Sequence, residues 1–172
     1  MKFLIFLLLF SAANARADYF AGAGTGLRTR DQSANGPGIS RIHAASVGYL
    51  WTDWSAQLEA IEIRHESGAG NTLVSSRQLD TTAWLRRHLA PHAWNPFLAL
   101  GFGIQQEKVD THFNQTVTSN TGENVRILGI GLGVQAGRKD SVGIAFEIRY
   151  LSGSGLRTVT LYESVTKLVY QF

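Results

Sequence analysis

The chain has 172 residues, with 16 Lys and Arg against 13 Asp and Glu, no cysteine, 18 glycines and 3 prolines. This length suits one domain, and a content of 44% hydrophobic and 17% charged residues is too apolar for a disordered chain. The lack of cysteine excludes a disulfide scaffold, a thiolate metal site and a cysteine nucleophile. The formal charge of +3 does not indicate nucleic-acid binding, because the basic residues form no run longer than pairs such as Arg86-Arg87.

The first residues have the pattern of a secretory signal peptide. Lys2 supplies a positive charge, residues 3–10 (FLIFLLLF) form an unbroken apolar run, and small residues precede Asp18. The run is too short for a transmembrane helix, which needs about 20 apolar residues. We predict a signal peptide at residues 1–17 with cleavage after Ala17, which leaves residues 18–172 as the mature domain.

Beyond the signal segment, apolar residues alternate with small or polar ones, which is the period of β-strands. Residues 98–105 read LALGFGIQ and residues 128–135 read LGIGLGVQ, so one face is bulky and apolar and the other is glycine-rich or polar. No stretch shows the spacing of a sustained amphipathic helix. The alternation predicts eight strands, at residues 18–28, 40–51, 55–66, 77–89, 96–109, 124–137, 142–151 and 158–172.

The connections between these strands alternate in length. Those after even strands are short (52–54, 90–95 and 138–141), and those after odd strands are longer and polar (29–39, 67–76 and 110–123), with a short fourth at 152–157. An even number of strands of this length, joined by alternating turns and loops, is typical of barrels that cross a membrane, where every backbone group must pair. We therefore predict an all-β chain that forms an eight-stranded antiparallel up-and-down transmembrane β-barrel.

The composition of the two strand faces indicates which of them meets lipid. In a soluble lipocalin-like barrel the bulky apolar face would point inward around a ligand. Here the opposite face is rich in Gly, Gln, Glu and Arg, which suits a narrow interior in which charges of both signs pair. We expect the bulky face to meet lipid and interior ion pairs to form among Glu147, Arg149, Glu163 and Lys167.

Strand 55–66 does not fit this pattern easily. If Ile61, Ile63 and His65 face lipid, so does Glu59, which is costly in mid-bilayer. Either a bulge near Ala60 or an interfacial depth for Glu59 would resolve the conflict.

Three tryptophans lie at the short connections. Trp51, Trp54 and Trp94 are placed where an aromatic belt at a membrane–water interface is expected.

The C-terminus carries a resemblance to a known class. The chain ends in LVYQF, with Leu168, Tyr170 and Phe172 on one face, and this ending resembles the C-terminal signature of Gram-negative outer-membrane barrel proteins. The whole mature chain resembles the small barrels typified by outer-membrane protein X and by the transmembrane domain of outer-membrane protein A. The resemblance implies a place in the bacterial outer membrane, periplasmic termini and extracellular long loops. It also implies as partners the outer-membrane lipids, lipopolysaccharide and the barrel assembly machinery.

A second, partial resemblance concerns an internal repeat. Residues 61–70 (IEIRHESGAG) and 146–155 (FEIRYLSGSG) share six identities, which similar hairpins of one barrel would also explain. The segment HESGAG resembles the His-x-Ser stretch of outer-membrane lipid A deacylases, which use a His, a Ser nucleophile and a Glu fourteen residues after the His. This makes His65 and Ser67 weak catalytic candidates. In those enzymes the motif lies on the seventh strand and the Glu on the eighth. Here the seventh-strand residue fourteen before Glu163 is Arg149, which cannot act as a base, and Leu151 takes the place of the Ser. No carboxylate follows His65 at that spacing, so the dyad lacks an orienting group.

These observations favour an integral outer-membrane protein of the cell envelope with a structural or interaction role, rather than an enzyme, and the alternative is a lipid A acyl-ester hydrolase. We expect no cofactor and no metal, because His43, His88, His92 and His112 are scattered without ligand spacing. An eight-stranded interior is filled by side chains, which disfavours a pore. Polar loops such as residues 114–124 suit hydrogen bonding to sugars or proteins, with no particular partner indicated.

Overall fold

The computed structural model describes residues 17–30, 38–69, 72–89, 94–113, 116–122, 124–137, 140–154 and 159–172. The regular elements are the strands β1 (Ala17–Arg30), β2 (Gly38–Trp51), β3 (Trp54–Ala69), β4 (Thr72–His88), β5 (Trp94–Phe113), β6 (Thr116–Thr121), β7 (Val125–Ala136), β8 (Ser141–Ser154) and β9 (Val159–Gln171). Residues 1–16 of the predicted signal peptide lie outside the described part of the chain. No helix in that part is long and apolar enough to cross a membrane.

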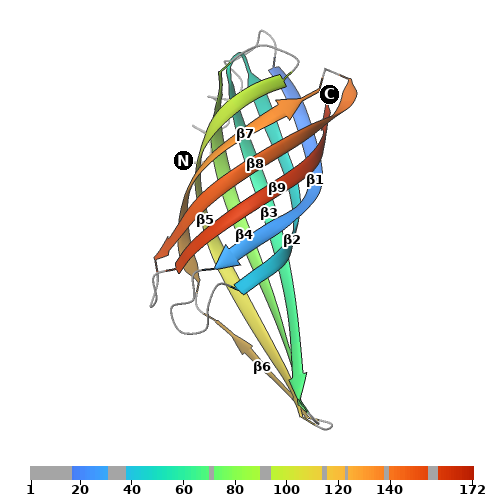
Figure 1. Cartoon of the computed structure of the whole chain (residues 1–172), viewed down its shortest axis with the longest axis vertical. Helices are drawn as coiled ribbons and strands as arrows, with labels where there is room; N and C mark the ends of the chain where they lie inside the picture. The colour runs from blue at the N-terminus through green and yellow to red at the C-terminus, as the bar shows by residue number, and fades with distance from the viewer. Residues whose placement is uncertain are drawn as a thin grey trace, which may run out of the picture.

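Eight of the strands close into a barrel. Each pairs antiparallel with its neighbours in the order β4-β3-β2-β1-β9-β8-β7-β5, and the pairing of β4 with β5 completes the circle. The sixth strand, β6, pairs only with β5. Figure 1 shows the strands running obliquely around the barrel, as closure of a sheet requires. The predicted eight-stranded antiparallel fold is confirmed.

The bulky apolar face of the strands forms the outer wall of the barrel. Leu100 is 63% exposed, and its cross-strand neighbours Leu85 and Ile130 are exposed with it. The same holds for alternate apolar residues of β8 and β9, including Ile148, Tyr150 and Leu168. This arrangement is the opposite of a lipocalin-like barrel, in which these side chains would be enclosed.

Strand β3 turns its odd-numbered residues from Ser55 to Ile63 inward. Glu59, Ile61 and Ile63 are all buried, whereas Leu58 and Ala60 are exposed. The pairing of β3 with β4 is continuous from Trp54 to Ala69, so no bulge interrupts the alternation. The expectation that Ile61 and Ile63 face lipid was therefore wrong. Both isoleucines join an apolar cluster inside the barrel, and Glu59 lies with them in the interior.

Two of the predicted loops are largely strand. β3 and β4 continue through the segment 67–76, and the segment 110–123 holds the end of β5 and the whole of β6. β2 pairs with β3 only as far as Glu62, and β7 begins at Val125, opposite Gln105. Beyond that level the chain forms a four-stranded antiparallel sheet outside the closed barrel. This protruding sheet comprises residues 64–69 of β3, 72–77 of β4, 108–113 of β5 and 116–121 of β6.

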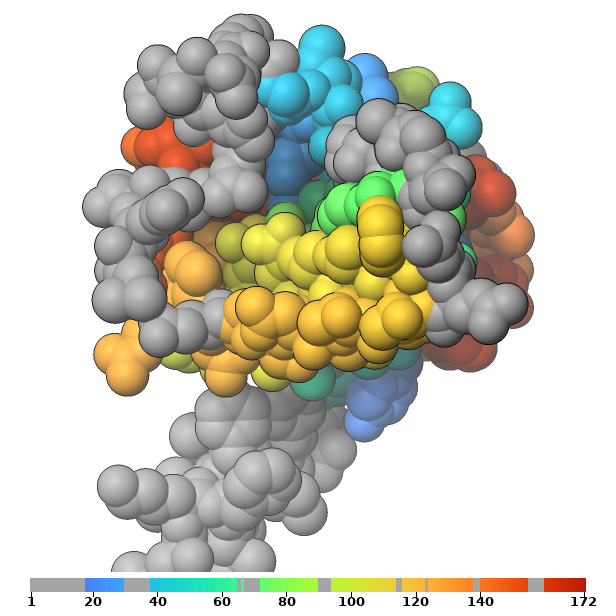
Figure 2. Space-filling view, turned by 90° about the horizontal axis from the view of Figure 1, so that it is seen from below, coloured from blue at the N-terminus to red at the C-terminus, as the bar shows by residue number. Residues whose placement is uncertain are grey.

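The protruding sheet extends the barrel at one end only. In Figure 1 it forms the narrow lower part, and the C-terminus lies at the opposite end. Seen from below in Figure 2, residues of β5 and β6, in yellow and gold, lie across the front of the molecule. Thr and Val support strand pairing here although the segment TVTSNT of β6 is exposed throughout.

Candidate functional site

In the part of the chain that the structure describes, eight buried charged residues form a network in the interior of the barrel. Four are cations and four are acids, so their formal charges cancel. The members, all 3% exposed or less, are Arg28, Glu59, Asp80, Arg86, Glu147, Arg149, Glu163 and Lys167. Charges this deeply buried are tolerated only when they are paired and hydrogen-bonded.

Arg149 on β8 is the centre of this network. Its guanidinium donates to Glu59 on β3, with one Nη2–Oε2 distance of 3.0 Å, and to Glu147 at 2.7 Å. Its Nη1 lies 3.5 Å from Glu163 Oε2. Lys167 on β9 donates to Glu59 Oε2 at 2.6 Å and lies 3.7 Å from Glu147. The four residues expected in the interior therefore lie together there, and Glu59 is a further acid that pairs with both of their cations, Arg149 and Lys167.

Two further arginines extend the network to both sides. Arg86 on β4 donates to Glu147 at 2.7 Å. Arg28 on β1 donates from Nε to Glu163 at 2.6 Å and also pairs with Asp80. The network thereby cross-links five strands of the barrel, β1, β3, β4, β8 and β9. Its members include partners that are 135 residues apart along the chain.

Aromatic rings pack against the guanidinium groups of this network. The guanidinium carbon of Arg149 lies 4.5 Å from the ring of Trp84, and that of Arg86 lies 4.7 Å from the ring of Phe97. Trp84 fits because the facing positions are Gly101 and Gly129, where an added Cβ would come within 2.6 and 2.8 Å of its ring. Glycine at alternate interior positions thus leaves room for large side chains such as Trp84. These side chains fill the interior, so little space remains for a water-filled channel.

His65 and Ser67, the catalytic candidates from the sequence, are part of β3 in the protruding sheet, and the structure describes the backbone of both but neither side chain. They pair through the main chain with Ser76 and Val74 of β4. Ile63, two residues before His65, is inside the barrel. Glu163 is held by Arg28 and Arg149. Hydrolase activity at His65 and Ser67 stays a prediction.

A different serine and histidine are hydrogen-bonded in the structure. Ser55 Oγ lies 3.0 Å from His88 Nε2, near the turn that joins β2 to β3. Ser55 is 1% exposed and His88 is 6% exposed, so a substrate has no access to the hydroxyl. Sequence reasoning missed this pair because the two residues come from different strands. It satisfies two buried polar groups rather than forming a catalytic site.

The predicted belt residues lie at the end of the barrel opposite the protruding sheet. Trp51 pairs with Trp54 across the turn between β2 and β3, and Trp94 is 63% exposed. Trp51 packs against Tyr49, which in turn packs edge-on against Tyr19. The C-terminal residues Leu168, Tyr170 and Phe172 lie on the outer wall at this same end, with Tyr170 and Phe172 in edge contact. Their roles as belt and assembly signal stay predictions.

The outer face of the protruding sheet carries paired charges. Glu62, at the base of this sheet, forms ion pairs with Arg64 at 3.0 Å and with Arg77 at 2.6 Å. Asp110 pairs with Lys108 at 3.4 Å and accepts a 2.5 Å hydrogen bond from the hydroxyl of Ser119 on β6. That hydrogen bond lowers the pKa of Asp110 below its ordinary value. The Ser119–Asp110 hydrogen bond joins β6 to β5, and the Glu62–Arg77 ion pair joins β3 to β4.

A cavity of about 330 Å³ with a mixed polar and apolar lining lies where the protruding sheet meets the barrel. Its lining includes Arg28, Ser76, Gln78, Gln105 and Glu107. Among the described residues no group of three or more His, Cys, Asp or Glu is arranged to hold a metal ion.

The fold defines the class of protein. A closed eight-stranded antiparallel barrel with an apolar outer wall is the fold of the small outer-membrane barrels. No protein-family profile matches the chain, and no curated protein matches it in sequence.

Solved structures of three bacterial proteins share this fold. Neisserial surface protein A (NspA) matches with a TM-score of 0.70 at 15% identity over 92% of this chain and 100% of that one. The attachment invasion locus protein Ail of Yersinia pestis matches with 0.67 at 14% identity, over 92% and 100%. The outer-membrane protein OprG of Pseudomonas aeruginosa matches with 0.62 at 14% identity, over 91% and 96%. At these identities the likeness concerns the fold.

Proposed function

We propose that this protein is an integral outer-membrane protein whose rigid barrel holds the protruding sheet outside the membrane as an interaction surface. The observation that carries the proposal is the division of the molecule into two parts. The barrel has an apolar outer wall suited to lipid, and the protruding sheet has a polar, charge-paired surface suited to water. The aromatic residues Trp51, Trp54 and Trp94 support an interface at the opposite end.

The edge of the protruding sheet supports an interaction role. β6 is paired on one side, with β5, and the described residues place no strand on its other side. An unpaired strand edge offers backbone hydrogen-bonding groups to an extended partner segment. Ser, Thr and Asn along β6 would keep such contacts polar.

The proposal implies that the protruding sheet is extracellular and that the turn between β2 and β3 is periplasmic. Because the chain has no cysteine, single introduced cysteines test this orientation directly. Single cysteines are introduced as Asn120→Cys in β6 and Thr52→Cys in the turn between β2 and β3. On intact cells a membrane-impermeant maleimide should label N120C, and it should label T52C only after the outer membrane is permeabilised. Labelling of T52C on intact cells, or of neither variant, would contradict the proposal.

The structural or interaction role also predicts an unchanged lipid A. Mass spectrometry of lipid A from cells with and without the gene should show the same acyl chains, whereas adhesion or resistance to detergent should fall in cells without it. Loss of an acyl chain only in cells that carry the gene would instead favour the deacylase hypothesis. In that case, the chain should be retained in cells that carry His65→Ala.

A further inference from the structure

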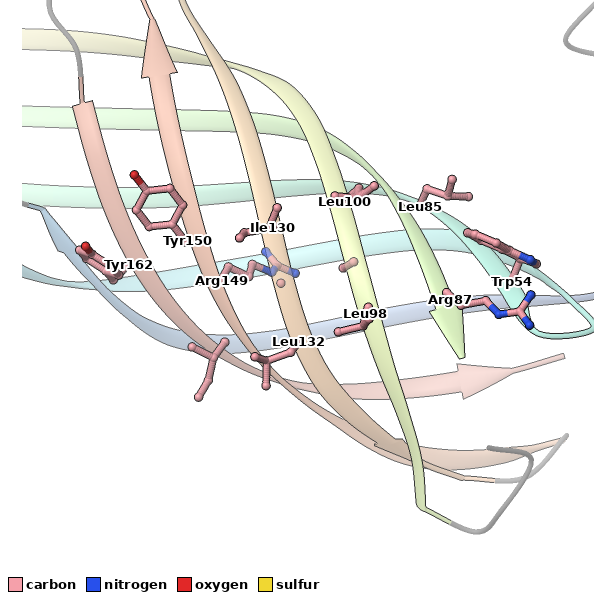
Figure 3. Close-up of a pocket in the computed structure, with 13 residues that line it drawn as sticks. Trp54, Leu85, Arg87, Leu98, Leu100, Ile130, Leu132, Arg149, Tyr150 and Tyr162 are labelled. Carbon is pink, nitrogen blue, oxygen red and sulfur yellow. The ribbon is translucent and has the colours of Figure 1, made fainter. Parts of the chain in front are cut away.

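The outer wall of the barrel contains an apolar groove of about 560 Å³. Figure 3 shows its lining side chains spread across several adjacent strands, with Trp54 and Arg87 at one end and Tyr150 and Tyr162 at the other. The groove lies on the wall that the proposed function places against lipid, so the inference below rests on that function.

Two rows of cross-strand neighbours form the sides of the groove. One row consists of Leu85, Leu100, Ile130, Tyr150 and Tyr162, and the other of Arg87, Leu98, Leu132 and Ile148. The floor between the rows includes Ala99 and Gly131, which add little side chain to the wall. The first row crosses four strand intervals, about 19 Å at ~4.8 Å per interval. Because the strands tilt by about 35–45°, the row runs obliquely to the membrane normal and covers most of one leaflet of the hydrocarbon core, about 15 Å thick.

A cation lies at the end of the groove near the turn between β2 and β3. The side chain of Arg87 is 46% exposed, its guanidinium carbon lies 5.1 Å from the ring of Trp54, and one nitrogen is 3.4 Å from Asp53. An arginine has five N–H donors, so a single long contact with Asp53 leaves most of them available. Arginine binds phosphate through paired hydrogen bonds, and tryptophan is suited to the interface between hydrocarbon and headgroups.

We propose that this groove binds a glycerophospholipid of the periplasmic leaflet, with an acyl chain along the two rows and the phosphate on Arg87. The apolar lining matches the chain, and the cation matches the headgroup at the depth where the aromatic residues indicate an interface. A second copy of this protein fits less well, because it would have to bring an anionic group to Arg87 across an apolar surface.

The test uses the full-length mature protein refolded in detergent micelles and phosphatidylglycerol as the probe. Native mass spectrometry at increasing lipid concentration should show one phosphatidylglycerol retained per barrel. Arg87→Gln should weaken retention at least tenfold, and the matched change Arg64→Gln in the protruding sheet should leave it within twofold. A diacylglycerol with the same chains but no phosphate should bind the original protein as weakly as phosphatidylglycerol binds R87Q.

A second pair of variants tests the groove itself. Leu98→Trp would fill it and should abolish retention, whereas Phe102→Trp, on the outer wall of the same strand but outside the groove, should not. Equal retention in all variants would overturn the proposal in favour of unspecific lipid contact, and a protein dimer that excludes the lipid would overturn it in favour of a second copy. Because folding is checked in micelles by gel migration, the result does not depend on the cysteine labelling that tests orientation in cells.

Discussion

Replacing Arg149 by methionine is expected to destabilise the folded barrel by about 3–5 kcal/mol. The change removes the cation shared by Glu59, Glu147 and Glu163 and leaves these buried carboxylates with fewer partners. It also removes the cation that packs on the ring of Trp84. Urea unfolding in detergent micelles, followed by tryptophan fluorescence and by the migration of the unheated protein on a gel, measures the loss.

The controls for this experiment separate buried from exposed charge. Arg64→Met removes an arginine whose side chain is 70% exposed, and the stability should change by less than about 0.5 kcal/mol. The double variant Glu59→Gln with Arg149→Met should be less destabilised than the sum of the two single variants, because it removes both members of one buried pair. Equal stability of R149M and R64M would show that the network does not hold the barrel together.

The alternation of residues along the strands was sufficient to predict the barrel. Segments such as residues 98–105 and 128–135 alternate bulky and small side chains over their whole length, and the structure exposes the bulky set. The signal is strong because lipid on one side and a narrow lumen on the other impose opposite requirements on neighbouring residues.

The rule that bulky apolar residues face lipid failed for β3, because apolar residues also occur inside the barrel. The lumen contains apolar clusters next to the ion pairs, so Ile61 and Ile63 are interior although their side chains would suit lipid. The charged Glu59 was the better guide to the orientation of this strand. A buried carboxylate requires a partner, and both partners of Glu59, Arg149 and Lys167, lie in the lumen.

The contacts within the network depend on how the strands are aligned, which no local pattern records. Arg149 and Glu59 are 90 residues apart and come from strands that do not pair with each other. Which side chains meet across the lumen follows from the register of every strand in the circle. The protruding sheet was missed for a related reason, because β6 is held by pairing with β5 and by the Ser119–Asp110 hydrogen bond rather than by an apolar pattern.

A charge introduced on the outer wall should reveal whether lipid covers it. Ile130 is 57% exposed at the middle of β7, between Leu100 and Tyr150. In reconstituted bilayers Ile130→Arg should destabilise the barrel by about 2–4 kcal/mol, the cost of an arginine near the bilayer midplane. Val117→Arg makes the same kind of change at a 59% exposed position of β6 and should cost little, because this position is proposed to face water. Unfolding by urea in lipid vesicles measures both, and similar losses for I130R and V117R would contradict a membrane-spanning wall.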